Sequence, residues 1–123
     1  MSPKSHILIV DSDKNFTDAL VERLKTCEYL TAGITSGAQL FQIVNQFKPN
    51  MIIVSTDLQN PTWTDLLDRI KHSSLFKDKP TTLLLCRDMT PGLESQAKLH
   101  DITKILLKPV RFNELIEVIE KIT

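Results

Sequence analysis

The chain of 123 residues carries 15 basic and 15 acidic side chains, so its formal net charge is zero. That length suits a single domain that buries about two-thirds of the surface its unfolded chain exposes. Nucleic-acid binding would require a basic surplus and a membrane span about 20 consecutive apolar residues, and the sequence has neither. It also lacks the apolar region of a signal peptide, and two scattered cysteines, Cys27 and Cys86, favour a cytoplasmic location.

Five short apolar segments are predicted to be strands. The first, His6–Val10, is continuously apolar after its first residue and stops at Asp11, which is typical of a strand covered on both faces. Related patterns, weaker in the first case, occupy residues 29–35, 51–54, 83–85 and 105–107.

Helical periodicity follows each of the first three strands. The first helix is predicted over residues 14–27, with Asp13 as its N-cap. Ser36 is predicted to cap the second helix, whose buried side would hold Leu40, Phe41, Val44 and Phe47. The third helix is predicted around Leu66, Leu67 and Ile70. Trp63, in the loop before it, is expected to pack over that loop more than to act as an exposed anchor for a partner.

Two further helices complete the pattern. Pro91 is predicted at the first position of the fourth helix, where a missing N–H costs nothing, and the apolar candidates of that helix are Leu93, Ala97 and Leu99. Asn113 is predicted to cap the last helix, which carries a wide apolar stripe formed by Leu115, Ile116, Val118, Ile119 and Ile122.

Alternation of five strands with five helices predicts an α/β fold with a parallel sheet and helices on both faces. In such sheets the functional residues lie at the carboxyl ends of the strands, near the point where the strand order reverses. That rule directs attention to four segments that follow strands, namely residues 11–13, 55–57, 86–88 and 108–109.

These segments resemble the receiver domains of two-component signalling proteins. The resemblance lies in residues 7–11 (Ile-Leu-Ile-Val-Asp), in residues 49–54 and in the pair Lys108-Pro109, and it extends over residues 6–122. It implies a single receiver-like domain over residues 1–123 with the flavodoxin-like (βα)5 fold, doubly wound, with strand order 2-1-3-4-5. It also implies a cis peptide bond before Pro109.

The family's chemistry is a phosphoryl transfer. Acidic residues after the first strand hold Mg²⁺ while a phosphoryl group moves onto an aspartate at the end of the third strand. A Thr or Ser ends the fourth strand, an aromatic residue lies in the fifth, and the lysine of the Lys-Pro pair contacts the phosphate.

Ser55 falls at the phosphoacceptor position when residues 49–71 are laid on the family pattern without a gap. The alternative register makes Asp57 the acceptor and Pro61 its partner proline, but it requires two extra residues before Asp57. A serine hydroxyl is neutral, is a poor ligand for Mg²⁺, and would need a general base that receivers do not provide.

Three more positions depart from the pattern. Ser12 takes the second place of the acidic pair, Cys86 (or Leu85) stands at the Thr/Ser position, and Ile105 stands at the aromatic position. The metal positions would be Asp11, Ser12 and Asp57, with weak or absent binding, so no cofactor is expected. Lys108 is expected to pair with Asp11 or Asp57 more than to bind phosphate.

The sequence therefore favours a degenerate receiver that is not an enzyme and acts by binding another signalling protein or a second copy of itself. The expected surface is the face of the fourth helix, fifth strand and fifth helix, including Ile105, Ile116 and Val118. The alternative is a working receiver that accepts phosphate on Asp57 with Mg²⁺. A nucleotide or flavin binder is disfavoured because residues 11–15 are acidic and the chain has only three glycines.

Overall fold

The computed structural model describes residues 5–76 and 78–122, which form a five-stranded parallel sheet in the order β2-β1-β3-β4-β5. The strands are β1 (His6–Val10), β2 (Leu30–Ile34), β3 (Met51–Ser55), β4 (Thr81–Cys86) and β5 (Lys104–Leu107). In the register, Ile7 of β1 lies beside Thr31 of β2 on one side and beside Met51 of β3 on the other. The predicted α/β class and strand order are confirmed.

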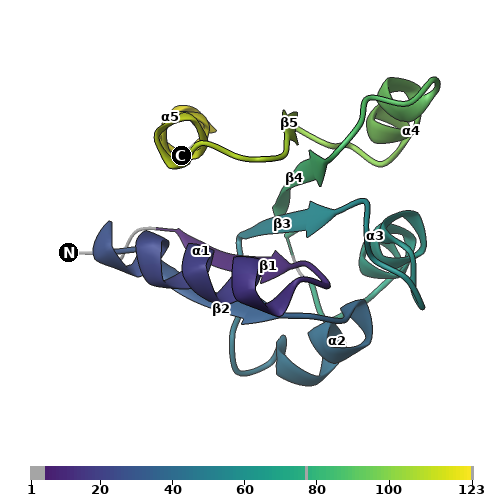
Figure 1. Ribbon diagram of the computed structural model, residues 1–123. Helices are drawn as coiled ribbons and strands as arrows, with labels where there is room; N and C mark the ends of the chain where they lie inside the picture. Colours follow the sequence, from purple (N-terminus) through teal and green to yellow (C-terminus); the bar gives the residue numbers. More distant parts are fainter. Residues whose placement is uncertain (1–4, 77, 123) are drawn as a thin grey trace.

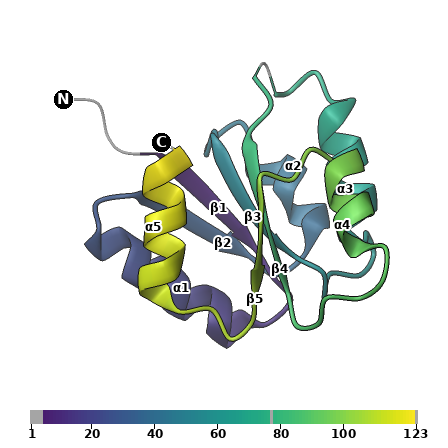
Figure 2. The same cartoon turned by 90° about the horizontal axis from the view of Figure 1, so that it is seen from above.

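Helices cover both faces of the sheet, as Figures 1 and 2 show. One face carries α1 (Lys14–Thr26) and α5 (Phe112–Ile122). The other carries the 3₁₀ helix η1 (Gly37–Gln39), α2 (Leu40–Ile43), α3 (Trp63–Lys71) and α4 (Leu93–Leu99). Within the described residues, no helix is both long and apolar enough to cross a membrane.

Alternation along each strand divides the core into two apolar clusters. Ile7 and Ile9 of β1 face α1 and α5, whereas Leu8 and Val10 face α2, α3 and α4. The same alternation continues through β3 and β4, because successive side chains of a strand point to opposite faces of the sheet. Burial on both faces explains why these strands are continuously apolar in sequence.

Close packing of α1 on the sheet depends on Gly33 in β2. A methyl group at Gly33 would lie 2.4 Å from Cγ2 of Thr17 and 3.0 Å from Cγ2 of Val21, both in α1. Thr17 also donates a hydrogen bond from its hydroxyl to the carbonyl oxygen of Asp11, at 3.1 Å. This hydrogen bond ties α1 to the backbone of Asp11, the residue that directly follows β1.

The second helix is shorter than predicted. Ser36 does act as a cap, because its Oγ accepts a hydrogen bond from the N–H of Ala38 at 3.2 Å. However, a 3₁₀ turn comes first, and the α-helix ends at Ile43, so Phe47 lies beyond it. Phe47 is half-buried and still packs against the same core cluster as Leu40 and Val44, beside the ring of His6 with centroids 6.0 Å apart.

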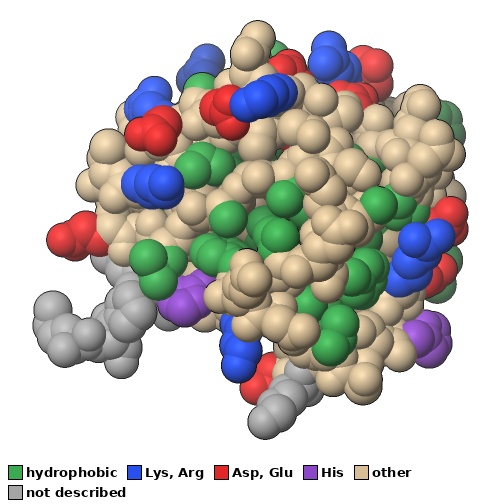
Figure 3. Space-filling model, turned by 90° about the horizontal axis from the view of Figure 1, so that it is seen from below, with side chains coloured by type: hydrophobic (Ala, Val, Ile, Leu, Met, Phe, Trp, Pro, Cys, Tyr) green, Lys and Arg blue, Asp and Glu red, His purple; other side chains and the backbone are tan. Residues whose placement is uncertain are grey.

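The face formed by β2 and α2 is the one seen from below in Figure 3, with hydrophobic side chains gathered across its middle. Leu30 of β2 is among the most exposed large apolar side chains described, at 48%. Phe41 and Ile43 of α2 are partly buried against the adjacent core cluster. Apolar side chains therefore reach the surface along this edge of the molecule.

The start of α4 was predicted wrongly. Leu93, not Pro91, is the first helical residue, and Gly92 before it is the N-cap, because the carbonyl of Gly92 accepts the first α-helical hydrogen bond, from the N–H of Gln96 at 3.0 Å. Gly92 has φ of +85°, a conformation that glycine adopts at no steric cost. Leu99 is 75% exposed, because two residues after Ala97 a side chain points to almost the opposite side of a helix.

The start of α5 also differs from the prediction. The helix begins at Phe112, so Asn113 lies inside its first turn and is not the cap. The carbonyl of Arg111 accepts a hydrogen bond from the N–H of Leu115 at 3.0 Å, which places the cap two residues earlier. Trp63 is buried, at 7% exposed, and its ring meets that of His100 edge-on at 5.6 Å. However, it is the first residue of α3 and part of the core cluster, not a residue of the preceding loop as predicted.

Candidate functional site

The polar residues predicted at the strand ends meet at one edge of the sheet. Asp11 follows β1, Ser55 ends β3, and Lys108 follows β5. Parallel strands bring their carboxyl ends to the same edge, and the strand order reverses between β1 and β3. We call Asp11, Ser55, Asp57 and Lys108 the strand-end pocket.

Lys108 links the other three members of this pocket. Its Nζ lies 2.6 Å from Oδ2 of Asp11, 3.3 Å from Oγ of Ser55 and 3.3 Å from Oδ2 of Asp57. The side chain of Lys108 is 11% exposed and that of Asp11 is 1% exposed, so the pair is shielded from water. Lys108 was predicted to pair with Asp11 or Asp57, and it contacts both carboxylates. The peptide bond between Lys108 and Pro109 is cis, as the resemblance implied.

Asp11 is held by the loop that starts α1. Its Oδ1 accepts a hydrogen bond from the N–H of Asp13 at 3.0 Å, and Asp13 in turn caps α1 by accepting from the N–H of Phe16. The ring of Phe16 lies under the ammonium group of Lys108, with Nζ 4.9 Å from the ring centroid. Ser12 is exposed, and no interaction between Ser12 and the pocket is observed.

Ser55 lies at the centre of the pocket and Asp57 at its rim. Ser55 is fully buried, and its Oγ accepts a hydrogen bond from the N–H of Asp57 at 3.1 Å. Asp57 is 31% exposed and lies inside a turn in which the N–H of Leu58 donates to the carbonyl of Ser55. The carboxylate of Asp57 thus reaches Lys108 through this turn.

Arg87, the residue directly after β4, was not recognised from sequence. Its Nε lies 3.1 Å from Oδ2 of Asp57, the same oxygen that Lys108 contacts. Burial is the largest single influence on the pKa of Asp57 and raises it, but the hydrogen bonds and charges of Arg87 and Lys108 together outweigh burial and lower that pKa. Asp57 is therefore ionised at neutral pH. The position of Arg87 at the end of a strand was the signal that could have revealed it.

The residues of the pocket do not fit Mg²⁺. This ion requires several free hard oxygen ligands in nearly octahedral geometry. Three carboxylate oxygens, both of Asp11 and Oδ2 of Asp57, already accept hydrogen bonds from protein donors. Among the described residues, no three His, Cys, Asp or Glu side chains are grouped to hold a metal ion, and no buried side-chain polar atom lacks a partner.

Cys86 and Ile105 occupy the positions where the family pattern has a hydroxyl and an aromatic ring. Cys86 ends β4 with 1% exposure, and its Sγ lies 3.8 Å from Sδ of Met89. Burial raises the pKa of the Cys86 thiol, with a smaller contribution from the charge of Asp88, so the group is a neutral thiol. Leu85, the other candidate for this position, faces the opposite core cluster. Ile105 is half-buried in β5.

The face of α4, β5 and α5 contains exposed apolar side chains that differ from those predicted. Leu107 of β5 is 53% exposed, and Met89, before α4, is 44% exposed. Both line a hollow of about 440 Å³ between α4 and β5, which Ile105 also lines. Ile116 and Val118 of α5 are partly buried against the core, so they contribute less surface than the sequence suggested.

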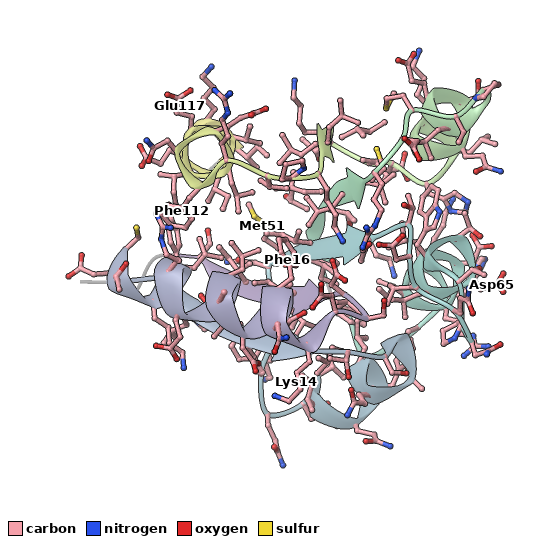
Figure 4. The ribbon with its side chains drawn as sticks, in the orientation of Figure 1. Lys14, Phe16, Met51, Asp65, Phe112 and Glu117 are labelled. Atoms are coloured by element: carbon pink, nitrogen blue, oxygen red, sulfur yellow. The ribbon has the colours of Figure 1, made fainter. Side chains whose placement is uncertain are left out.

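A second hollow lies between α1 and α5, with a volume of about 340 Å³. Phe16 of α1 and Phe112 of α5 line it, and in Figure 4 Phe112 lies between the two helices. The guanidinium of Arg23 stacks on the ring of Phe112 at 4.1 Å from its centroid. Phe16 therefore forms a wall shared by this apolar hollow and the strand-end pocket.

Solved structures share this architecture. The chemotaxis response regulator CheY4 of Vibrio cholerae superposes with a TM-score of 0.85 over 98% of this chain and 99% of that chain, at 17% sequence identity. The N-terminal domain of a response regulator receiver protein from Methanoculleus marisnigri JR1 superposes with a TM-score of 0.73 over 94% of each chain, at 25% identity. Fold and strand-end residues together define a receiver-type α/β signalling domain.

The family follows from sequence comparison. The family model of the response regulator receiver domain matches residues 7–120, so this chain belongs to the response regulator receiver family of two-component signalling. The two-component response regulator ARR15 of Arabidopsis thaliana is 27% identical over 93% of this chain and 60% of its own length. The response regulator ORR7 of Oryza sativa subsp. japonica is 28% identical over 86% of this chain and 50% of its own length. The chain thus spans only part of these relatives.

Proposed function

We propose that this chain is a degenerate receiver domain that transmits signals by binding proteins and does not accept a phosphoryl group. The observation that carries the proposal is the position of the Lys108 ammonium group, within 3.3 Å of oxygen atoms of Asp11, Ser55 and Asp57. A protein cation occupies the position between the two carboxylates. The domain is accordingly proposed to have no enzymatic activity and no resident cofactor.

The chemistry of Ser55 supports this proposal. Its Oγ is buried and accepts hydrogen bonds from a backbone N–H and from an ammonium group. A serine becomes nucleophilic only when a neighbouring base takes its proton. Both carboxylates nearby are engaged by cations, so neither is free to act as that base.

Asp57 supports the rival function, a working receiver. Its carboxylate is ionised and partly exposed, so a small phosphodonor could approach it. The same carboxylate is bonded by Arg87 and by Lys108, and these cations would have to release Oδ2 before a metal ion could bind beside it. We therefore favour the degenerate function.

A direct test is incubation of the purified protein with acetyl phosphate and Mg²⁺, followed by intact mass measurement. We expect no added phosphate, and no amide shifts at Ser55, Asp57 or Lys108 on addition of beryllofluoride with Mg²⁺. The Asp57→Asn and Ser55→Ala variants are the matched controls, because they identify the acceptor if a phosphate is found. A stoichiometric adduct that disappears in Asp57→Asn would establish the rival function.

The proposed partner surface is the face of α4, β5 and α5, and its occupant is another signalling protein or a second copy of this domain. The apolar side chains of Leu107 and Met89 beside a hollow of about 440 Å³ support it. Exposed apolar groups gathered on one face are typical of surfaces that bind other proteins. The balanced charge supports a domain that does not itself bind nucleic acid, and we propose a cytoplasmic location.

A further inference from the structure

We propose that Arg87 is a built-in replacement for part of the charge of a divalent cation, and that it excludes metal ions from the strand-end pocket. This inference rests on the proposed function and deepens it, because it names the residue that closes the site. It also gives Arg87 a positioning role, since it joins the loop after β4 to the loop after β3.

The geometry places Arg87 at the open side of the pocket. Lys108, 11% exposed, occupies the inner side, whereas Arg87, 65% exposed, approaches Asp57 from solvent. Both donate to Oδ2 of Asp57, at 3.3 Å and 3.1 Å. A metal ion that arrives from solvent would therefore meet a guanidinium group on the oxygen that it needs.

Charge balance gives the physical reason for exclusion. Asp11 and Asp57 contribute two negative charges, and Lys108 and Arg87 contribute two positive charges, so these four ion-paired groups together carry no net charge. Removal of the guanidinium charge would leave one net negative charge. Repulsion between unit charges about 4 Å apart is worth about 1 kcal/mol even in bulk water and more near a protein surface, so the arginine affects cation affinity through charge as well as through occupancy.

Arg87 also connects the pocket to the proposed partner surface. Met89 lies two residues after Arg87 in the same loop and lines the hollow between α4 and β5. The ion pair with Asp57 therefore ties this loop to the loop after β3. An exposed ion pair contributes little to global stability, so the variant can be tested in a folded protein.

The first experiment compares Mg²⁺ and Mn²⁺ binding by the wild type and by Arg87→Gln. The glutamine removes the charge and keeps a polar side chain of similar reach. Arg69→Gln is the matched control, because Arg69 is exposed on α3 and its replacement changes the net charge by the same amount. Binding is followed by Mn²⁺-induced broadening of the amide signals of Asp11, Asp13 and Asp57, and by calorimetry.

We expect Arg87→Gln to lower the dissociation constant for the metal ion by about fivefold or more, the factor that corresponds to about 1 kcal/mol of repulsion. Arg69→Gln should leave the dissociation constant unchanged. Equal affinities for the wild type and Arg87→Gln would overturn the inference, as would an equal gain in Arg69→Gln.

The same comparison in a Ser55→Asp background keeps the test decisive if the wild-type pocket binds too weakly to measure. There a third carboxylate is present, and Ser55→Asp/Arg87→Gln should bind the metal about fivefold or more tightly than Ser55→Asp alone. Phosphodonor labelling of the wild type tests the proposed function separately. Labelled wild type with an Arg87-dependent metal affinity would therefore disprove degeneracy and leave the role of Arg87 standing.

Discussion

Lys108 and Asp11 are 97 positions apart in the chain, yet Nζ of one lies 2.6 Å from Oδ2 of the other. The Asp11 side chain is 1% exposed. A buried carboxylate is strongly destabilising unless a cation pairs with it, and here the ammonium group of Lys108 is that cation. The pair joins the end of β1 to the end of β5 and spans the whole width of the strand-end pocket.

Replacement of Lys108 by methionine should destabilise the fold by about 3 kcal/mol, because it leaves a buried carboxylate without its counter-ion. The double variant Asp11→Asn/Lys108→Met should recover at least half of that loss, since it removes the unpaired charge. Urea denaturation of the two single variants, the double variant and the wild type provides the measurement. A loss in the double variant as large as the sum of the single losses would show that the pair is not coupled.

Replacement of Ser55 by alanine should lower the free energy of unfolding by about 1 kcal/mol. The change removes the acceptor for the N–H of Asp57 and for Lys108 at a fully buried position. Ser95→Ala, at an exposed position in α4, is the control and should change stability by less than about 0.5 kcal/mol. If chemical denaturation gives the same value for both variants, the Ser55 hydroxyl has no structural role.

Acid should weaken the fold partly through Asp57. Its pKa in the folded protein is lower than its ordinary value of 3.8, despite burial, because of Arg87 and Lys108. The ionised form therefore contributes stability that is fully present above the unfolded pKa and is lost as pH falls through the folded pKa. The stability difference between wild type and Asp57→Asn should thus shrink as pH is lowered from about 6 to below about 3. Thermal unfolding across that range checks the direction, and a difference that grows on acidification would contradict it.

A photo-crosslinking residue at position 107 should capture the partner of the domain, whether a second copy or another signalling protein. Leu107 is 53% exposed on β5 beside the hollow between α4 and β5. The control carries the photo-crosslinking residue in place of Leu75, which is 46% exposed in the loop after α3, and it should give no crosslink. Capture only from position 75, identified by mass spectrometry of the crosslinked peptide, would place the partner surface elsewhere.

Substitution of Gly33 by alanine should destabilise the protein by about 1–3 kcal/mol through overpacking. The new methyl group would lie 2.4 Å from Cγ2 of Thr17, so α1 would have to move away from β2. The double variant Gly33→Ala/Thr17→Ser, which removes the opposing methyl group, should regain part of the loss. Urea midpoints of the three proteins test this, and an unchanged midpoint in Gly33→Ala would show that α1 can shift freely.

Strand and helix positions were predictable from sequence where burial dictates composition. Continuous apolar runs in β1, β3 and β4 arise because both faces of those strands are covered, and that requirement is local to each segment. The helix boundaries near Pro91 and Asn113 were not predictable, because the true first turns depend on which carbonyl accepts the first helical hydrogen bond.

The residue types at the strand ends, including Ser55, Asp11 and Lys108, were visible in the linear sequence because each directly follows an apolar run. What only the tertiary structure decided was their pairing: that Lys108 contacts both carboxylates, and that Arg87 reaches Asp57 from a different strand. Side-chain pairing across a sheet depends on how four separate strand ends converge in space, whereas sequence patterns record only the burial of each strand.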